Sequence, residues 1–351
     1  MEKIQDLHVR TIEPLIAPRI LKAEYPADEA TVKTVVNARE TIRAILKGGD
    51  PRLLCIVGPC SIHDPTAALD YAKRLSDLAP RLAERMYVVM RVYFEKPRTT
   101  VGWKGLINDP HMDDSCDVRE GLRIARRLLL DINRLGVAAA TELLDPITPQ
   151  YIADLISWAA IGARTTESQT HREMASGLSM PVGFKNNTDG NLQVAINAVE
   201  SARHPHSFLG ITQDGVSGVV RTSGNPDTHI VLRGGKTPNY GSANIGECVD
   251  LMAKAGLEPR VVVDCSHAQT GKNFRRQPDV LQALVDQIRA GSHAVMGVMV
   301  ESNVNAGAQK PNPDRSKLAY GVSVTDPCID WQTTERCLLE SHAALASRQA
   351  A

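Results

Sequence analysis

The sequence predicts an α/β protein: a (β/α)8 TIM barrel with an N-terminal extension and an inserted β-hairpin. Two observations predict this fold. Eight short runs rich in Val, Ile, Leu and Ala recur along the 351 residues, as expected of strands buried on both faces. Most of these runs are separated by segments of helical period. Eight buried strands alternating with helices are typical of a closed parallel barrel.

The apolar runs are each too short to form a helix. In chain order they are LLCIVGPCS (53–61), MYVVMRVYF (86–94), GVAAATELL (136–144), WAAIGART (158–165), PVGFKN (181–186), HIVLRGG (229–235), RVVVDCSH (260–267) and AVMGVMVES (294–302).

Helix signals lie between most of the runs. The segment 65–84 starts with Pro at a first turn, and 117–136 opens at Asp117, a good N-cap, and ends at Gly136. Segments 244–256 and 278–291 also end in Gly, a common helix stop.

Two segments fall outside the alternation. Residues 1–45 precede the first barrel strand and include most of a helical pattern, EATVKTVVNARETIRAILKGG. Residues 206–222 read as two β segments around a Gly-containing turn. We expect 1–45 to be an extension for regulation or assembly, and 46–351 to be the catalytic barrel carrying the hairpin at 206–222.

Composition narrows the class of protein. Forty basic residues balance forty acidic ones, so no overall field attracts nucleic acid or an anionic membrane. The N-terminus lacks the apolar core of a secretory signal, and no apolar run approaches the roughly 18 residues of a membrane span. Seven cysteines, an odd number, disfavour a disulfide framework. We expect a cytoplasmic protein with neither a nucleic-acid nor a membrane partner.

Cationic side chains end or follow four of the predicted strands, at the barrel end where such enzymes build their active sites. They are Arg91, Lys96, Arg98, Arg164, Lys185 and Arg233. Any one of them could instead lie on an exposed loop beside an acid. Six cations aimed at one place repel each other unless anions hold them, so the group predicts substrates with several phosphate or carboxylate groups.

A second set of strand-end residues suits a metal. Cys60, His267, Glu301 and Asp326 offer the mixed N, O and S donors of a divalent transition metal such as Mn, Fe, Co or Zn. No short motif certifies the set. The stretch VVVDCSHAQTGK (261–272) leaves a rival open, because Cys265 and His267 are two residues apart and share one face of a strand.

Long motifs throughout the chain resemble the type I 3-deoxy-D-arabino-heptulosonate 7-phosphate (DAHP) synthases of the shikimate pathway. They are GPCSIHDP (58–65), RVYFEKPRTTVGWKGL (91–106), GARTTESQTHR (162–172), GFKNNTDG (183–190), LRGGKTPNY (232–240), DCSHA (264–268), VMVESN (298–303) and GVSVTDPC (321–328). The resemblance covers nearly the whole chain.

The resemblance implies condensation of phosphoenolpyruvate with erythrose 4-phosphate and water to give DAHP and phosphate. It places the metal on Cys60, His267, Glu301 and Asp326, so the thiol partner of His267 is Cys60. It places phosphoenolpyruvate on Arg91, Lys96, Glu142, Ala163 (through its backbone), Arg164, Lys185 and Arg233, and erythrose 4-phosphate on Pro97, Arg98, Thr99 and Asp326. Lys96 would be a general acid, with Glu142 and His267 handling protons.

The resemblance also implies feedback inhibition by an aromatic amino acid and assembly into dimers or tetramers. The effector pocket would include Pro149, Gln150, Gly177, Leu178, Ser179, Phe208, Gly210 and Val220, with Gln5 and Asp6 from a neighbouring subunit. These positions could alternatively be ordinary packing. Gly210 leaves room for a tyrosine hydroxyl, which predicts tyrosine as the effector.

Three alternatives remain. A 3-deoxy-D-manno-octulosonate 8-phosphate synthase would use arabinose 5-phosphate, but KPRTT (96–100) differs from the K-A-N-R-type loop of that family. A Schiff-base aldolase using Lys185 leaves the four metal ligands unexplained. A non-catalytic aromatic amino-acid sensor is disfavoured because every chemical group of the enzyme is present.

Overall fold

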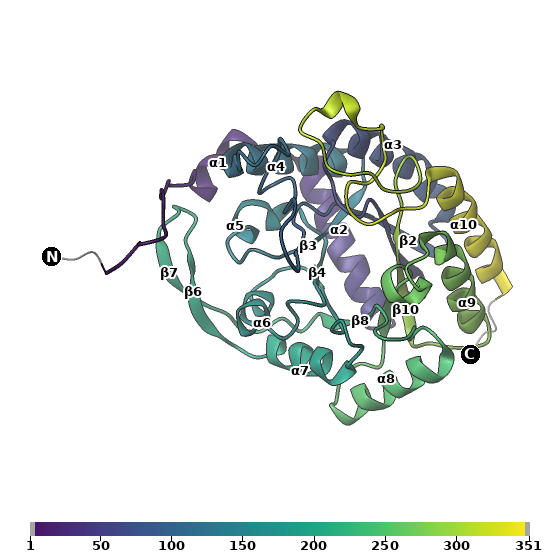
Figure 1. Ribbon diagram of the computed structural model, residues 1–351. Helices are drawn as coiled ribbons and strands as arrows, with labels where there is room; N and C mark the ends of the chain where they lie inside the picture. Colours follow the sequence, from purple (N-terminus) through teal and green to yellow (C-terminus); the bar gives the residue numbers. More distant parts are fainter. Residues whose placement is uncertain (1–3, 348–351) are drawn as a thin grey trace.

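The computed structural model describes residues 4–347 and confirms the barrel (Figure 1). Eight parallel strands close in the order β1-β10-β9-β8-β5-β4-β3-β2. Each of the predicted apolar runs overlaps one of them, and only β8 begins outside its run, by one residue. The strands are β1 (Leu53–Gly58), β2 (Met86–Arg91), β3 (Ala138–Glu142), β4 (Trp158–Ile161), β5 (Val182–Lys185), β8 (Thr228–Leu232), β9 (Val261–Asp264) and β10 (Val295–Glu301).

Helices pack around the ring because alternate strand residues point outward and need apolar cover. Asp117 is the N-cap of α4, as predicted, and its carboxylate accepts a hydrogen bond from the Glu120 backbone N–H at 3.1 Å. The helices after the first strand are α3 (Pro65–Leu82), α4 (Val118–Arg134), α5 (Pro149–Ile152), α6 (Gln169–Ser176), α7 (Leu192–Arg203), α8 (Ser242–Lys254), α9 (Gln277–Arg289) and α10 (Trp331–Ala344).

The N-terminal segment carries α1 (Pro18–Glu24) and α2 (Glu29–Leu46), and α2 crosses the ring in Figure 1. Ile42 and Ile45 of α2 are buried in the same apolar cluster as inward-facing strand residues such as Leu54. Arg39 of α2 also donates hydrogen bonds to the Ile156 carbonyl oxygen, before β4. Helix α2 therefore closes the N-terminal end of the barrel.

The predicted hairpin is confirmed between α7 and β8. Strands β6 (Ser207–Ile211) and β7 (Ser217–Arg221) pair antiparallel, with Phe208 opposite Val220. The side chains of Leu209 and Val219 are 86% and 62% exposed. Helix α6 contacts β6, so the hairpin stands beside the barrel on the side of α5 and α6 (Figure 1).

No helix within residues 4–347 has both the length and the hydropathy required to cross a lipid bilayer.

Candidate metal and anion site

A cavity of about 640 Å³ opens at the carboxyl ends of the barrel strands. Its walls carry far more positive than negative charge: seven Lys or Arg side chains against three carboxylates. The cations are Arg91, Lys96, Arg98, Arg164, Lys185, Arg233 and Lys272; the carboxylates are Glu142, Glu301 and Asp326. All six cations predicted from the strand ends therefore line one cavity.

Two of the cations are already paired with buried acids. Arg91 is fully buried and its Nη2 lies 3.1 Å from Glu301 Oε1. Lys185 Nζ lies 2.7 Å from Asp264 Oδ2. Burial lowers the pKa of the Lys185 ammonium, but Asp264, Tyr93 and Glu142 together outweigh burial and the net pKa is raised, so this lysine stays charged.

Three other cations have side chains that are not paired with a carboxylate within residues 4–347. Within residues 4–347, the ion pairs and hydrogen bonds found for these three side chains lead to backbone oxygens only: Arg98 Nε to Trp103 O at 2.7 Å, Arg164 Nη1 to Pro97 O at 3.2 Å, and Arg233 Nη1 to Gly234 O at 3.4 Å. Burial lowers the pKa of Arg233, although Asp264 opposes this shift. A ligand with several anionic groups would neutralise these guanidinium groups bidentately.

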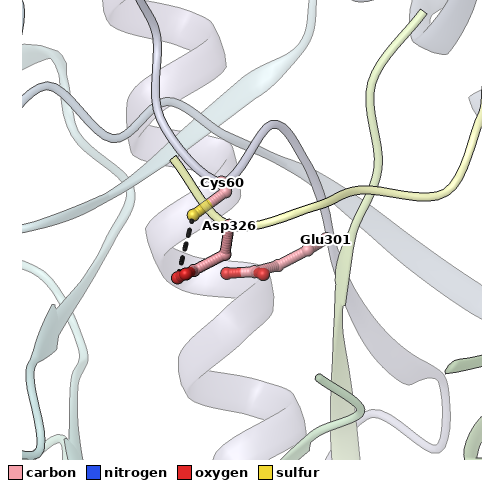
Figure 2. A group of neighbouring side chains, drawn as sticks. All are labelled: Cys60, Glu301 and Asp326. Atoms are coloured by element: carbon pink, nitrogen blue, oxygen red, sulfur yellow. Dashed lines mark hydrogen bonds between the residues drawn. The ribbon is translucent and has the colours of Figure 1, made fainter. Parts of the chain in front are cut away.

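Beside the cations, Cys60, Glu301 and Asp326 gather from three distant parts of the chain, as Figure 2 shows. One ligand atom of each lies within 4.8 Å of the others. Cys60 Sγ donates to Asp326 Oδ2 at 3.5 Å. A thiol packed against two carboxylates is a mixed O/S donor set whose negative charge a divalent transition metal neutralises, so these residues fit a metal.

Lys96 joins the two halves of the site. Its Nζ lies 3.3 Å from both the backbone oxygen and the Sγ of Cys60. Burial lowers the pKa of Lys96, but the neighbouring acidic groups, Cys60 and Glu142 first among them, together outweigh burial and raise it. Burial also raises the pKa of the Cys60 thiol, to about 12. A metal bound at Cys60 would therefore have to displace the thiol proton.

His267 stands at the edge of this group rather than within it. Its Nε2 is 3.2 Å from Asp264 Oδ2 and 3.9 Å from Glu301 Oε1. Cys265 is directed elsewhere: it is fully buried in the apolar core shared by barrel and helices, and it is not among the residues that line the cavity. The geometry thus favours the distant Cys60 over the neighbouring Cys265 as the thiol nearest the site.

Glu142 has a buried carboxylate oxygen that a ligand could satisfy. It is 6% exposed, lines the cavity, and its Oε1 has no hydrogen-bond partner within residues 4–347. An unpaired buried oxygen costs free energy unless water or a ligand satisfies it. Gly162 allows this position, because a Cβ there would collide with Glu142 Oε1.

Some of the remaining predicted site residues line the cavity and others do not. Pro97 and Ala163 line the cavity, as expected. Thr99 is exposed in the loop after β2 and is not among the lining residues. Sequence reasoning gave no role to Asp264, although its place at a strand end was visible. Its contacts with Lys185 and His267 make it the link between the anion and metal groups.

The predicted effector residues come together outside the barrel. Pro149 and Gln150 begin α5, Gly177 ends α6, and Leu178 and Ser179 follow it. The other residues, Phe208, Gly210 and Val220, lie on the hairpin. The hairpin turn reaches α5, because Gln213 Nε2 donates to Gln150 Oε1 at 2.7 Å. Gln5 and Asp6 are exposed on the N-terminal arm.

A second cavity, of about 410 Å³, lies at the opposite end of the barrel. Its arginines are largely neutralised: Arg52 is paired with Asp50 at 2.5 Å and Arg85 with Glu84 at 2.8 Å. It therefore lacks the excess cationic charge of the first cavity.

Comparison with known proteins identifies relatives over nearly the whole chain. Residues 26–339 match the DAHP synthetase I family. The chain is 54% identical to the Tyr-sensitive phospho-2-dehydro-3-deoxyheptonate aldolase of Escherichia coli K12, covering 98% of this chain and 97% of that one. It is 55% identical to the Phe-sensitive enzyme of the same strain, covering 98% of each. The solved structure of the Francisella tularensis SCHU S4 aldolase superposes with a TM-score of 0.94 at 45% identity, covering 97% of this chain and 100% of that one. The chain therefore belongs to the DAHP synthetase I family of enzymes.

Proposed function

We propose that the chain condenses phosphoenolpyruvate with D-erythrose 4-phosphate and water, releasing DAHP and phosphate. The observation that carries this proposal is the cavity itself. Unneutralised arginines and a cluster of metal-type donors share one space at the carboxyl ends of the strands. Two phosphate esters and one carboxylate supply the anions that such a lining requires.

We propose that Cys60, His267, Glu301 and Asp326 hold a divalent metal such as Mn, Fe, Co or Zn. Three of these residues already cluster, and His267 Nε2 lies near Glu301, so a modest side-chain movement would complete the set. A metal bound there supplies Lewis-acid polarisation of the sugar aldehyde.

Phosphoenolpyruvate would occupy the deeper part of the cavity. Arg164, Lys185 and Arg233 hold its phosphate and carboxylate by preorganised charge, with Arg91 beneath them. The backbone of Ala163 and the carboxylate of Glu142 complete its surroundings. Pro97, Arg98 and Thr99 would hold the phosphate of the sugar, with Asp326 near its aldehyde end.

Residues of the cavity would donate and accept protons during the reaction. C3 of phosphoenolpyruvate forms a bond to the aldehyde carbon, and Lys96 gives a proton to the aldehyde oxygen. Water oriented by Glu142 adds to C2 and gives one of its protons to Glu142, while His267 would remain a metal ligand beside this step. The C2–O bond to phosphate then breaks as the hemiketal hydroxyl gives its proton to the departing phosphate, which leaves the ketone of DAHP. The proton held by Glu142 restores the ammonium of Lys96.

The choice of sugar tests the proposal. Purified protein incubated with phosphoenolpyruvate should release equal amounts of phosphate and seven-carbon product with erythrose 4-phosphate, and little with arabinose 5-phosphate. Preference for arabinose 5-phosphate would favour the octulosonate synthase instead. Aromatic amino-acid binding without phosphate release would favour a sensor.

We further propose that tyrosine inhibits the enzyme from the pocket beside the hairpin. A Cβ at Gly210 would lie 2.7 Å from Val220 Cγ2, so any side chain there would displace Val220 and narrow the space. Exposed Leu209 and Val219 on the outer face of the hairpin fit a dimer or tetramer contact. An inhibition series with Tyr, Phe and Trp in which only Phe acts would overturn the choice of effector.

A further inference from the structure

Tyr93 has no part in the site described so far, although it lines the cavity. It lies two residues beyond Arg91 on the continuation of β2, so both side chains point to the barrel interior. Tyr93 is fully buried and belongs to the same interior apolar cluster as Val89 and Met299. Its ring therefore forms part of the floor between the apolar interior and the charged cavity.

The face of this ring meets the two cations of β2 and its loop. The guanidinium carbon of Arg91 is 4.0 Å from the ring centroid, and Lys96 Nζ is 5.8 Å from it. The face of an aromatic ring carries partial negative charge and attracts a cation within about 6 Å, most strongly where water is excluded. Arg91 and Tyr93 are both fully buried, so this condition is met.

The other contacts of Arg91 explain why the ring matters for its direction. Its Nη2 is drawn to Glu301 Oε1 at 3.1 Å, and its Nη1 to Met299 Sδ at 2.6 Å. Glu301 is also one of the three clustered metal donors. Without the ring beneath it, the guanidinium could tilt to chelate Glu301 and turn its donors away from the cavity.

We propose that Tyr93 is a positioning residue for the reaction: its ring face holds Arg91, and more weakly Lys96, in the orientation that binds phosphoenolpyruvate. This inference rests on the proposed function. The ring rather than the hydroxyl carries the role, because the hydroxyl donates to Met299 Sδ at 3.8 Å, a weak acceptor.

The neighbouring Phe94 provides a matched control. It is also an aromatic residue, 1% exposed, but it belongs to the outer cluster between barrel and helices. Replacing either ring by Leu removes similar buried surface. Only the replacement at position 93 removes a ring from beneath the cations.

The test is calorimetric binding of phosphoenolpyruvate to the full-length protein loaded with Mn²⁺, without sugar phosphate. We expect Tyr93→Leu to raise Kd by roughly tenfold or more, the scale of a desolvated cation–π contact. Tyr93→Phe should stay within about threefold of the wild type, since the ring remains. Phe94→Leu should lower the midpoint of thermal unfolding without weakening binding.

A second series of variants carries phenylalanine with an increasing number of ring fluorines at position 93. Fluorination keeps the shape of the ring but reduces the partial negative charge of its face. This series serves as the test if Tyr93→Leu does not fold. Kd should then rise with each added fluorine. Equal Kd values across the fluorinated series, or for Tyr93→Leu and the wild type, would overturn the inference and leave the proposed function standing. A wild-type protein that does not bind phosphoenolpyruvate would overturn both.

Discussion

The two ends of the barrel are made by the same eight strands and are filled in opposite ways. At the N-terminal end, Ile42 and Ile45 of α2 close the interior with apolar surface. At the carboxyl end, the inward positions hold Arg91, Lys185 and Glu301. Strand alternation supplies inward positions at both ends, and side-chain chemistry alone decides which end is sealed and which binds.

The two ends of the barrel also differ in how their arginines are neutralised. Arg52 and Arg85 at the closed end are each paired with a carboxylate. Arg164 and Arg233 at the open end contact backbone oxygens instead. A guanidinium group without a carboxylate partner at the open end therefore indicates ligand binding. A guanidinium group paired with a carboxylate at the closed end indicates a structural role.

The largest expected effect separates the two candidate thiols. Cys60→Ser should reduce turnover by at least about a thousandfold, beyond the 10–100-fold cost of losing an outer partner of a metal ligand. Cys265→Ser should retain most activity, because Cys265 is packed in the outer core. Steady-state assays and metal analysis of both variants check this. The reverse result would restore the local Cys265–His267 pair.

Next comes a pH effect from the barrel interior. Burial lowers the pKa of His229 to about 4, and its Nε2 accepts a hydrogen bond from Trp158 Nε1 at 3.1 Å. The unfolded chain protonates this imidazole at higher pH than the folded chain does. Stability should therefore be lost as pH falls from about 6.5 to 4, by on the order of 3 kcal/mol.

Urea unfolding of the wild type and His229→Gln across this pH range measures that loss. The variant should show the shallower dependence, since Gln does not titrate. His204→Gln, at an exposed position, is the control and should match the wild type. Equal slopes for wild type and His229→Gln would show that His229 is not the group responsible.

Charge removal at the two ends should have unequal effects. Arg233→Ala should raise the KM for phosphoenolpyruvate by roughly 30-fold, about 2 kcal/mol, the usual value of a hydrogen bond to a charged group. Arg52→Ala should change that KM by less than about twofold, because Arg52 and its partly buried partner Asp50 lie at the opposite end of the barrel from the anion-binding cavity. Similar KM changes at both ends would break the comparison.

The smallest effect concerns the closing helix. Ile42→Val should cost about 1 kcal/mol of unfolding free energy, because it removes one buried methylene. Val36→Ala on the exposed face of α2 should stay within about 0.5 kcal/mol. Neither should alter KM. A changed KM in Ile42→Val at unaltered stability would mean that the closed end communicates with the site.

Much of the fold was predictable because its signals are local. Strands buried on both faces appear as continuous apolar runs, and Asp117 and Gly136 mark the ends of a helix in plain sequence. Helices α1, α5 and α6 were missed, since four to eight residues carry too few helical turns to show a period. Helix α10 was also missed, because the polar residues Thr334 and Ser341 occupy buried positions on its inner face. That α2 seals the barrel is tertiary information: its apolar stripe would look the same against any partner.

The site, like the fold, could be predicted from the sequence only in its local features. The cations and metal donors were predictable from their places at strand ends, because a closed barrel brings those ends together. Which acid pairs with which base was not. The Lys185–Asp264 and Arg91–Glu301 pairs join residues far apart in the chain, and their geometry depends on strand register. The support of Arg91 by Tyr93 is likewise invisible without the barrel interior.

We expect turnover to depend on a metal held by the thiol and carboxylates at the open end. Cobalt(II) titration of chelator-treated protein tests it directly, with absorbance and activity followed on the same samples. We expect a thiolate-to-metal absorption band and DAHP formation to rise together and saturate at one ion per chain. Full activity before any metal is added, or activity that rises without the thiolate band, would contradict the account.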